Sequence, residues 1–182
     1  NYGGRLSSVL DIRQKEGNSK KFSANGGIGL LSSRLTLEGP IVKDKVNFML
    51  AGRRSYFDLF FPLFDVPELN ESVAYFYDFN AKLNAKISKK DKIYLSAYFG
   101  RDQFSAAELF KFGWGNWTST LRWNRVISPK WFFNASAVYS DYKYQLGADG
   151  TTPFEWDSRI RNLVQNAGWT FYYNNALSLI HI

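Results

Sequence analysis

Residues 75–87 alternate between apolar and polar side chains, and this pattern is the strongest constraint on how the chain can fold. Every odd position from Tyr75 to Ile87 is apolar or aromatic, and every even position except Phe76 is polar. A β-strand sends successive side chains to opposite faces, so the pattern predicts a strand with one apolar and one polar face. Its length of about thirteen residues exceeds the roughly five or six usual in globular proteins, and the nine to eleven that cross a bilayer at a tilt. We therefore expect lipid on one face and a wet lumen on the other.

The composition agrees with a wall that has two unlike faces. Aromatic residues make up 18 % of the 182 residues, yet the mean hydropathy is only −0.31. This combination is unusual for a soluble core and typical of a barrel wall with an apolar outer face and a polar inner face. No apolar run approaches the roughly twenty residues of a transmembrane helix. The chain has no cysteine, which excludes a disulfide framework and thiolate metal sites.

Similar patterns elsewhere predict seven barrel strands joined in sequential order. The expected strands are residues 22–38, 46–56, 75–87, 93–99, 117–124, 131–140 and 163–174, after a short strand at 6–13. The first barrel strand changes phase near residues 30–33, which predicts a bulge or bend there. Connections 39–45, 88–91 and 128–130 are short, whereas 58–74, 103–115 and 147–156 are long. Short turns that alternate with long loops are typical of outer-membrane barrels.

Two segments resemble the family of TonB-dependent outer-membrane receptors. Residues 2–13, with the sequence YGGRLSSVLDIR, are similar to the last strand of that family's plug domain. Residues 30–41, LLSSRLTLEGPI, resemble its first barrel strand and first periplasmic turn, and residues 52–56, GRRSY, lie where its second strand emerges. The resemblance is specific over about the first sixty residues. After that it rests only on the regular succession of predicted strands and turns.

The resemblance implies a fold, a location and partners. It implies a barrel of about twenty-two strands filled by an N-terminal plug, in the outer membrane of a Gram-negative bacterium. Its function would be active import of a scarce nutrient. Lipid, a TonB-like periplasmic energy-coupling protein and a surface substrate-binding lipoprotein are the expected partners. The chain is then all-β and a fragment of a longer receptor: residues 1–18 end the plug, and 19–175 begin the barrel as an open curved sheet. Residues 176–182 are interpreted as a non-native tail, with the start of an eighth element as the alternative.

Five charged residues are candidates for contacts between plug and barrel. Arg5 and Asp11 lie in the plug-like strand, where ordinary surface exposure is the competing interpretation. Arg53, Lys82 and Arg122 occupy positions expected to face the lumen. There they would line a ligand path, bind plug carboxylates or pack in the lumen against the plug.

Other chemistries find little support in the sequence. His181 is the only histidine, so no metal site is expected. The glycines of residues 26–29 lack the third glycine of a dinucleotide loop, and the serine pairs lack a histidine base. Lysines concentrate in the short turns and away from the aromatic residues, which does not fit a nucleic-acid site despite the net charge of +7. We expect neither a cofactor nor an enzymatic activity.

Two other classes of protein compete with the importer interpretation. A passive porin, or another outer-membrane barrel including a barrel enzyme, would share the wall but begin directly in it, without a plug-like strand. A soluble β-rich binding module would not need strands of this length. The imported substrate stays open between siderophore, oligosaccharide and peptide, because plug apices and outer loops determine it. The ligand-binding residues stay open as well.

Overall fold

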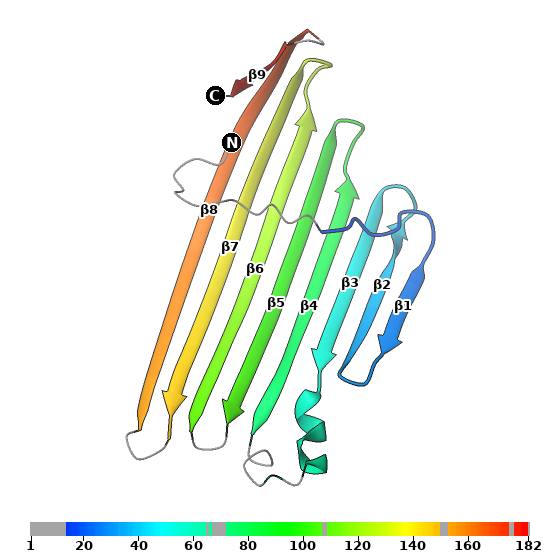
Figure 1. Ribbon diagram of the computed structural model, residues 1–182. Helices are drawn as coiled ribbons and strands as arrows, with labels where there is room; N and C mark the ends of the chain where they lie inside the picture. Colours follow the sequence, from blue (N-terminus) through cyan, green and yellow to red (C-terminus); the bar gives the residue numbers. More distant parts are fainter. Residues whose placement is uncertain are drawn as a thin grey trace.

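The computed structural model describes residues 14–64, 66, 72–106, 109–149, 153–174 and 177–181. Within them the chain forms one sheet of nine antiparallel strands that pair in sequence order, together with one short 3₁₀ helix (Figure 1). The strands are β1 (Ser23–Ile28), β2 (Ser32–Val42), β3 (Val46–Ser55), β4 (Val73–Lys86), β5 (Asp91–Ala106), β6 (Phe110–Val126), β7 (Trp131–Ala148), β8 (Phe154–Asn174) and β9 (Leu177–His181). The helix η1 (Phe57–Leu63) lies between β3 and β4. The expected all-β, antiparallel and sequential architecture is confirmed.

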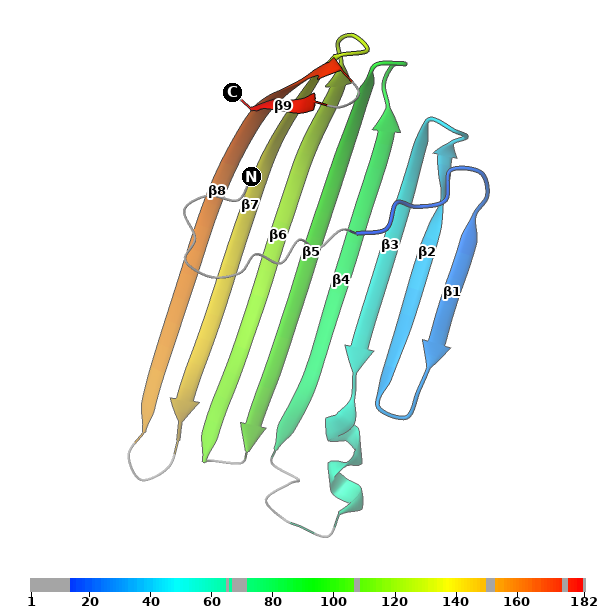
Figure 2. The same cartoon turned by 45° about the horizontal axis from the view of Figure 1, so that its top comes forward.

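The sheet is a single open layer (Figures 1 and 2). Its outermost strands, β1 and β9, do not pair with each other in the described part of the chain. Among the described residues, Met49 and Phe61 are the only buried hydrophobic side chains. The layer is therefore held together mainly by the backbone hydrogen bonds of its strand ladder, because the described residues form no second layer that would build a core with it. The plug strand expected at residues 6–13 lies outside the described residues.

The connections fall at two opposite ends of the sheet (Figure 1). We call the end with connections 43–45, 87–90 and 127–130 the turn end, and the opposite end, with connections 29–31, 56–72, 107–109 and 149–153, the loop end. In the first turn, Asp44 has a left-handed φ of 59°, and the Lys45 N–H donates to the Val42 carbonyl at 3.0 Å. Asp tolerates this backbone conformation better than most residues. The expected short turns are therefore present at the turn end.

The prediction of a single strand at residues 22–38 is wrong. The chain reverses there, and β1 and β2 pair antiparallel from Ser23 opposite Glu38 to Ile28 opposite Ser33. The Gly29 N–H donates to the Ser32 carbonyl at 2.9 Å and closes the turn. The change of phase in the sequence marks this three-residue turn instead of a bulge. Together with β9, the reversal raises the strand count from the expected seven to nine.

The prediction of a long loop at residues 103–115 is also wrong. β5 and β6 stay paired until Ala106 meets Phe110, so only residues 107–109 connect them. The other predicted loops shrink too: 149–153 separates β7 from β8, and η1 occupies part of the connection between β3 and β4. β6, β7 and β8 have 17, 18 and 21 residues. At roughly 3.3 Å per residue they span about 55–70 Å, twice the thickness of a bilayer's hydrocarbon core.

Candidate functional site

The clearest chemical feature of the sheet is an apolar belt on one face. Strand pairing places the odd residues of β4 to β8 on the same face as Phe48 and Leu50 of β3. We call this the belt face. Three successive rows across it are almost wholly apolar, and they contain Val46, Ala85, Ile93, Trp123 and Ala135; Phe48, Leu83, Leu95, Leu121 and Ala137; and Leu50, Ala81, Ala97, Ser119 and Tyr139. Leu95 and Leu121 are 47 % and 50 % exposed. So large an exposed apolar surface indicates contact with lipid or another apolar partner.

Aromatic rings border the belt on both sides. Toward the turn end, the Phe133 ring lies 5.5 Å from that of Trp123 and 4.6 Å from that of Trp169. Toward the loop end, the rings of Tyr77 and Phe99 are 5.9 Å apart. Paired aromatic borders around an apolar band are typical of the two interfaces of a membrane.

The limits of the belt shift from strand to strand in one direction. Toward the loop end the belt stops at Leu163 on β8 but continues to Tyr75 on β4, which lies three rows farther along in the pairing. Toward the turn end it stops at Ile93 on β5 and continues to Phe171 on β8. A level belt crosses inclined strands at successively different positions. The shift therefore fits the tilt of strands in a barrel wall.

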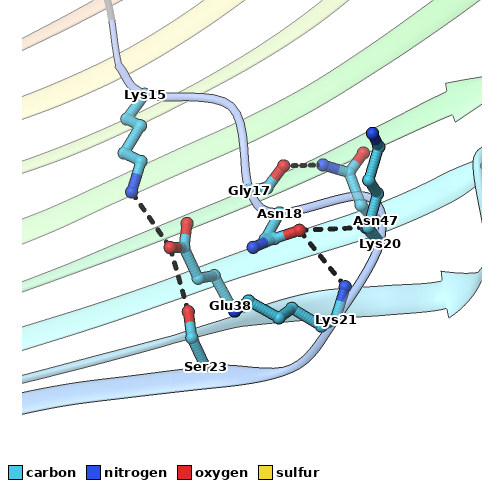
Figure 3. A network of polar contacts seen from close by, with 8 residues as sticks. All are labelled: Lys15, Gly17, Asn18, Lys20, Lys21, Ser23, Glu38 and Asn47. Carbon is cyan, nitrogen blue, oxygen red and sulfur yellow. Dashed lines mark hydrogen bonds and ion pairs between the residues drawn. The ribbon is translucent and has the colours of Figure 1, made fainter.

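The opposite face carries the segment of residues 14–21, which crosses β2, β3 and β4 (Figures 1 and 3). We call it the segment face. The Lys15 ammonium forms an ion pair with the Glu38 carboxylate at 3.0 Å, and the Ser23 hydroxyl donates to the same oxygen at 3.1 Å. The Asn47 side-chain amide donates to the Gly17 carbonyl (Figure 3). These contacts are polar, so the segment is held by hydrogen bonds and charge and not by an apolar core.

Gly17 lies so close to β3 that no side chain fits there. A Cβ atom at this position would overlap the Phe48 carbonyl, with the carbonyl carbon only 2.7 Å away. The Asp44 N–H donates to the Ser19 carbonyl at 3.1 Å, which attaches the segment to the first turn as well. The backbone of the segment therefore rests directly on the backbone of the sheet.

The predicted site residues lie in different surroundings. Lys82 donates a hydrogen bond from its ammonium to the Gln14 carbonyl at 2.8 Å, so it binds the segment. Arg53 instead pairs with Asp78 on the neighbouring strand, at 2.7 Å, and its guanidinium lies 4.8 Å from the centre of the Phe76 ring. Arg122 is on the segment face of β6, opposite Tyr94 and Ser136 in the pairing. Arg5 and Asp11 lie outside the described residues, and a contact of any of the five with a plug stays a prediction.

An aromatic pocket at the loop end of the segment face was missed by the sequence analysis. Its volume is about 380 Å³, and its lining includes the rings of Phe57, Phe76, Phe104, Phe112 and Trp114. The Phe112 ring lies 4.6 Å from that of Trp114 and 5.3 Å from that of Tyr144. Residues 103–115 were expected to form a loop, and only their pairing as strands places these even-numbered rings side by side on one face.

Other kinds of site find no support among the described residues. No group of three or more His, Cys, Asp or Glu side chains there lies close enough to hold a metal ion. No helix in that part of the chain is both long and apolar enough to span a membrane. Comparisons with family models, with curated proteins and with solved structures give no match to this chain. The functional argument therefore rests on the geometry of the two faces.

Proposed function

We propose that this chain is part of the wall of an outer-membrane β-barrel that imports a nutrient. The observation that carries the proposal is the apolar belt, which has aromatic borders and shifts along the strands as a tilted wall requires. In a barrel of this kind the belt face meets lipid. The segment face, with Asn80, Lys82 and Ser96, meets a polar lumen.

Import by an energised receptor, and not passive diffusion, is supported by the segment of residues 14–21. In a closed barrel this segment would lie inside the lumen and narrow it, because it rests on the segment face. A chain that enters the lumen before the first wall strand is what a plug domain requires. The ligand would then bind from outside, and a periplasmic energy-coupling protein would move the plug. On this proposal the protein has no enzymatic activity.

The aromatic pocket is the part of the lumen most suited to first contact with the ligand. It opens on the segment face near the loop end. We place this end outside the cell, because it carries the longest connection, residues 56–72, and outer-membrane barrels have their longer loops outside. Aromatic rings bind flat apolar surfaces of many ligands, including sugar rings and aromatic groups, so siderophore, oligosaccharide and peptide all stay candidates. We place the first contact there and leave the substrate class open.

Uptake measurements test the proposal. The complete receptor that contains residues 1–182 would be expressed in a Gram-negative host. Labelled ferric siderophores, oligosaccharides and peptides would be offered as candidate substrates. We expect uptake of one class to stop when the gene for the energy-coupling protein is deleted, while binding at the cell surface persists. Unchanged uptake in the deletion strain would favour the porin alternative. Failure of the protein to reach the outer membrane would overturn the proposed location as well.

A further inference from the structure

A row of cations lies directly past the belt, on the same face and toward the loop end. Consecutive strand pairings align six residues across the sheet from β3 to β8: Arg54, Tyr77, Arg101, Gly115, Lys143 and Arg159. Four of the six are cations, and the row contains no carboxylate. On β5 and β6 the preceding belt-face residues are Phe99 and Trp117, the last aromatic residues of the belt. We call this alignment the cation row.

The two central cations of the row have carboxylates nearby but form no ion pair with them. Asp141 accepts a hydrogen bond from the Arg159 Nε at 2.8 Å and lies 3.4 Å from the Arg161 Nε, so its charge is already shared. Arg101 and Lys143 are both exposed, and neither makes a hydrogen bond or ion pair in the described part of the chain. A surplus of positive charge favours an anion where the surface becomes apolar and water becomes scarce.

The space between these two cations is hollow. Residues from β5 to β8 line a hollow of about 930 Å³, with Gly113 and Gly115 in its floor. Its lining includes three cations, Arg101, Lys143 and Arg159, and two carboxylates, Asp141 and Asp157, and so carries one surplus positive charge. A Cβ atom on Gly115 would make only an ordinary contact, 3.6 Å from the Gly100 carbonyl oxygen. The packing of the sheet therefore does not require glycine there, and the missing side chain leaves the floor open.

The neighbourhood of the hollow fits an amphiphile better than a free anion. Trp117 and Tyr139, which end the belt, also line it. A headgroup in the hollow would thus have its acyl chains continue over the apolar rows. Arg101 and Lys143 lie on strands about 10 Å apart, two strand spacings. Their long side chains are able to reach one phosphate above Gly115.

The lysines of the turn end are arranged differently. Lys90 and Lys130 direct their ammonium groups to backbone carbonyls, those of Ile127 and Tyr173, each at 3.3 Å. These two cations bind the chain's own strand ends. Arg101 and Lys143 make no such hydrogen bond in the described part of the chain. This difference distinguishes the cation row from the basic turns.

We propose that the hollow over Gly115 binds the phosphate headgroup of a membrane lipid, with Arg101 and Lys143 on the phosphate and the lipid's acyl chains on the belt. This site rests on the proposed barrel wall and goes beyond it, because it lies on the outer surface and plays no part in import. Basic residues beside an apolar membrane surface bind anionic headgroups with about 1 kcal/mol per cation. The occupant is an anionic lipid, defined by a phosphate headgroup with net negative charge and by its acyl chains.

Lipid titration tests this site. The complete receptor would be purified in nonionic detergent and titrated with dioleoyl phosphatidic acid, and the bound lipid counted by native mass spectrometry. The double variant R101Q/K143Q should lower the affinity about thirtyfold. G115V, which fills the hollow without changing charge, should also lower it. The control K43Q/K89Q removes two charges at the turn end and should leave it nearly unchanged.

The outcomes separate the possible ligands. Inorganic phosphate at the same concentrations should not compete with the lipid, and dioleoyl phosphatidylcholine should bind no more tightly to the wild type than to R101Q/K143Q. Competition by inorganic phosphate would show a free-phosphate site and overturn the lipid assignment. Equal losses in R101Q/K143Q and K43Q/K89Q would overturn the site itself. A receptor that inserts and imports normally but fails these tests overturns only this inference, whereas a protein that does not insert overturns the proposed function.

Discussion

Lys82 and Gln14 are joined by a hydrogen bond of 2.8 Å although 68 residues separate them in the chain. The donor is a side chain of the sheet and the acceptor is a backbone carbonyl of the segment. The same is true of Asn47 and Gly17. The sheet therefore holds the segment largely through its backbone, and the fit depends on how closely the two backbones approach each other.

The first prediction concerns that close approach. Gly17→Ala should release the segment from the sheet, because the added Cβ would overlap the Phe48 carbonyl. Limited trypsin digestion of the folded protein should then cut several-fold faster after Lys15, Lys20 and Lys21. The matched control is Gly27→Ala, whose Cβ would have only the flexible Arg34 side chain nearby, at 3.7 Å. Equal cleavage rates in the two variants would contradict the docking of the segment.

The second prediction concerns the belt. If the belt face meets lipid as proposed, Leu121→Arg, near the middle of the belt, should destabilise the protein in a bilayer by about 2–4 kcal/mol, because lipid does not solvate the charge. Thr120→Arg, one residue away on the segment face, should cost about 1 kcal/mol or less. Urea unfolding from vesicles measures both. Equal effects, or the reverse order, would show that the belt does not face lipid.

Thr120 is a better lumen control than the polar residues of β4. Asn84 follows Leu83 and is only 7 % exposed, and its side-chain amide has no hydrogen-bond partner among the described residues. An arginine at that position would disturb both the packing and the segment-bearing part of the sheet. The loss of stability would then report more than the polarity of the lumen.

The sequence predicted the faces and the order of the strands but not their ends. Alternation around Tyr75 identified β4 almost to the residue, because one face of the strand is apolar along its whole length. On β5 the belt face changes at Arg101 from apolar to charged, so the pattern fades although the strand continues to Ala106. Hydrophobic alternation records where a strand crosses the belt, whereas backbone pairing continues beyond it.

The candidate site was only partly accessible to sequence reasoning. Lys82 was placed on the lumen side by its even position, and the structure adds its contact with Gln14. The cation row was not recognised, because Arg54, Arg101, Lys143 and Arg159 lie on four different strands and only the register aligns them. Register depends on the turns, and the turn at residues 29–31 and the connection 107–109 were the ones misjudged.

The third prediction is a pH dependence at Asp141, which lies past the belt on β7. A hydrogen bond from Arg159, together with the charges of Arg159 and Arg161, lowers the pKa of Asp141 from 3.8 to about 2. A carboxylate whose pKa is lowered by folding stabilises the folded state above the unfolded pKa, and this contribution is lost as the pH falls from about 4 toward 2. Asp141→Asn should therefore destabilise the folded protein at pH 6 and have little effect near pH 2.

Urea unfolding at the two pH values measures this difference. Asp157→Asn is the matched control. Asp157 lies on β8, on the same face and also past the belt, but it forms no ion pair within 4 Å in the described part of the chain. Its effect should be small at both pH values. A loss of stability in Asp141→Asn that is the same at pH 6 and pH 2 would contradict the ion-paired state of Asp141.

The fourth prediction is that residues 1–182 alone do not form a stable monomer. The sheet ends in β1 at one side and β9 at the other, and each leaves one row of backbone groups without a strand partner in the described structure. Exposed strand edges pair with other chains, and in a membrane each unpaired backbone group costs several kcal/mol. The isolated chain, refolded in detergent, should therefore give a broad range of oligomers by light scattering. A longer chain with enough strands to close the wall of the proposed barrel should give one species. A monodisperse monomer of the isolated chain would show that the sheet does not need further strands to close it.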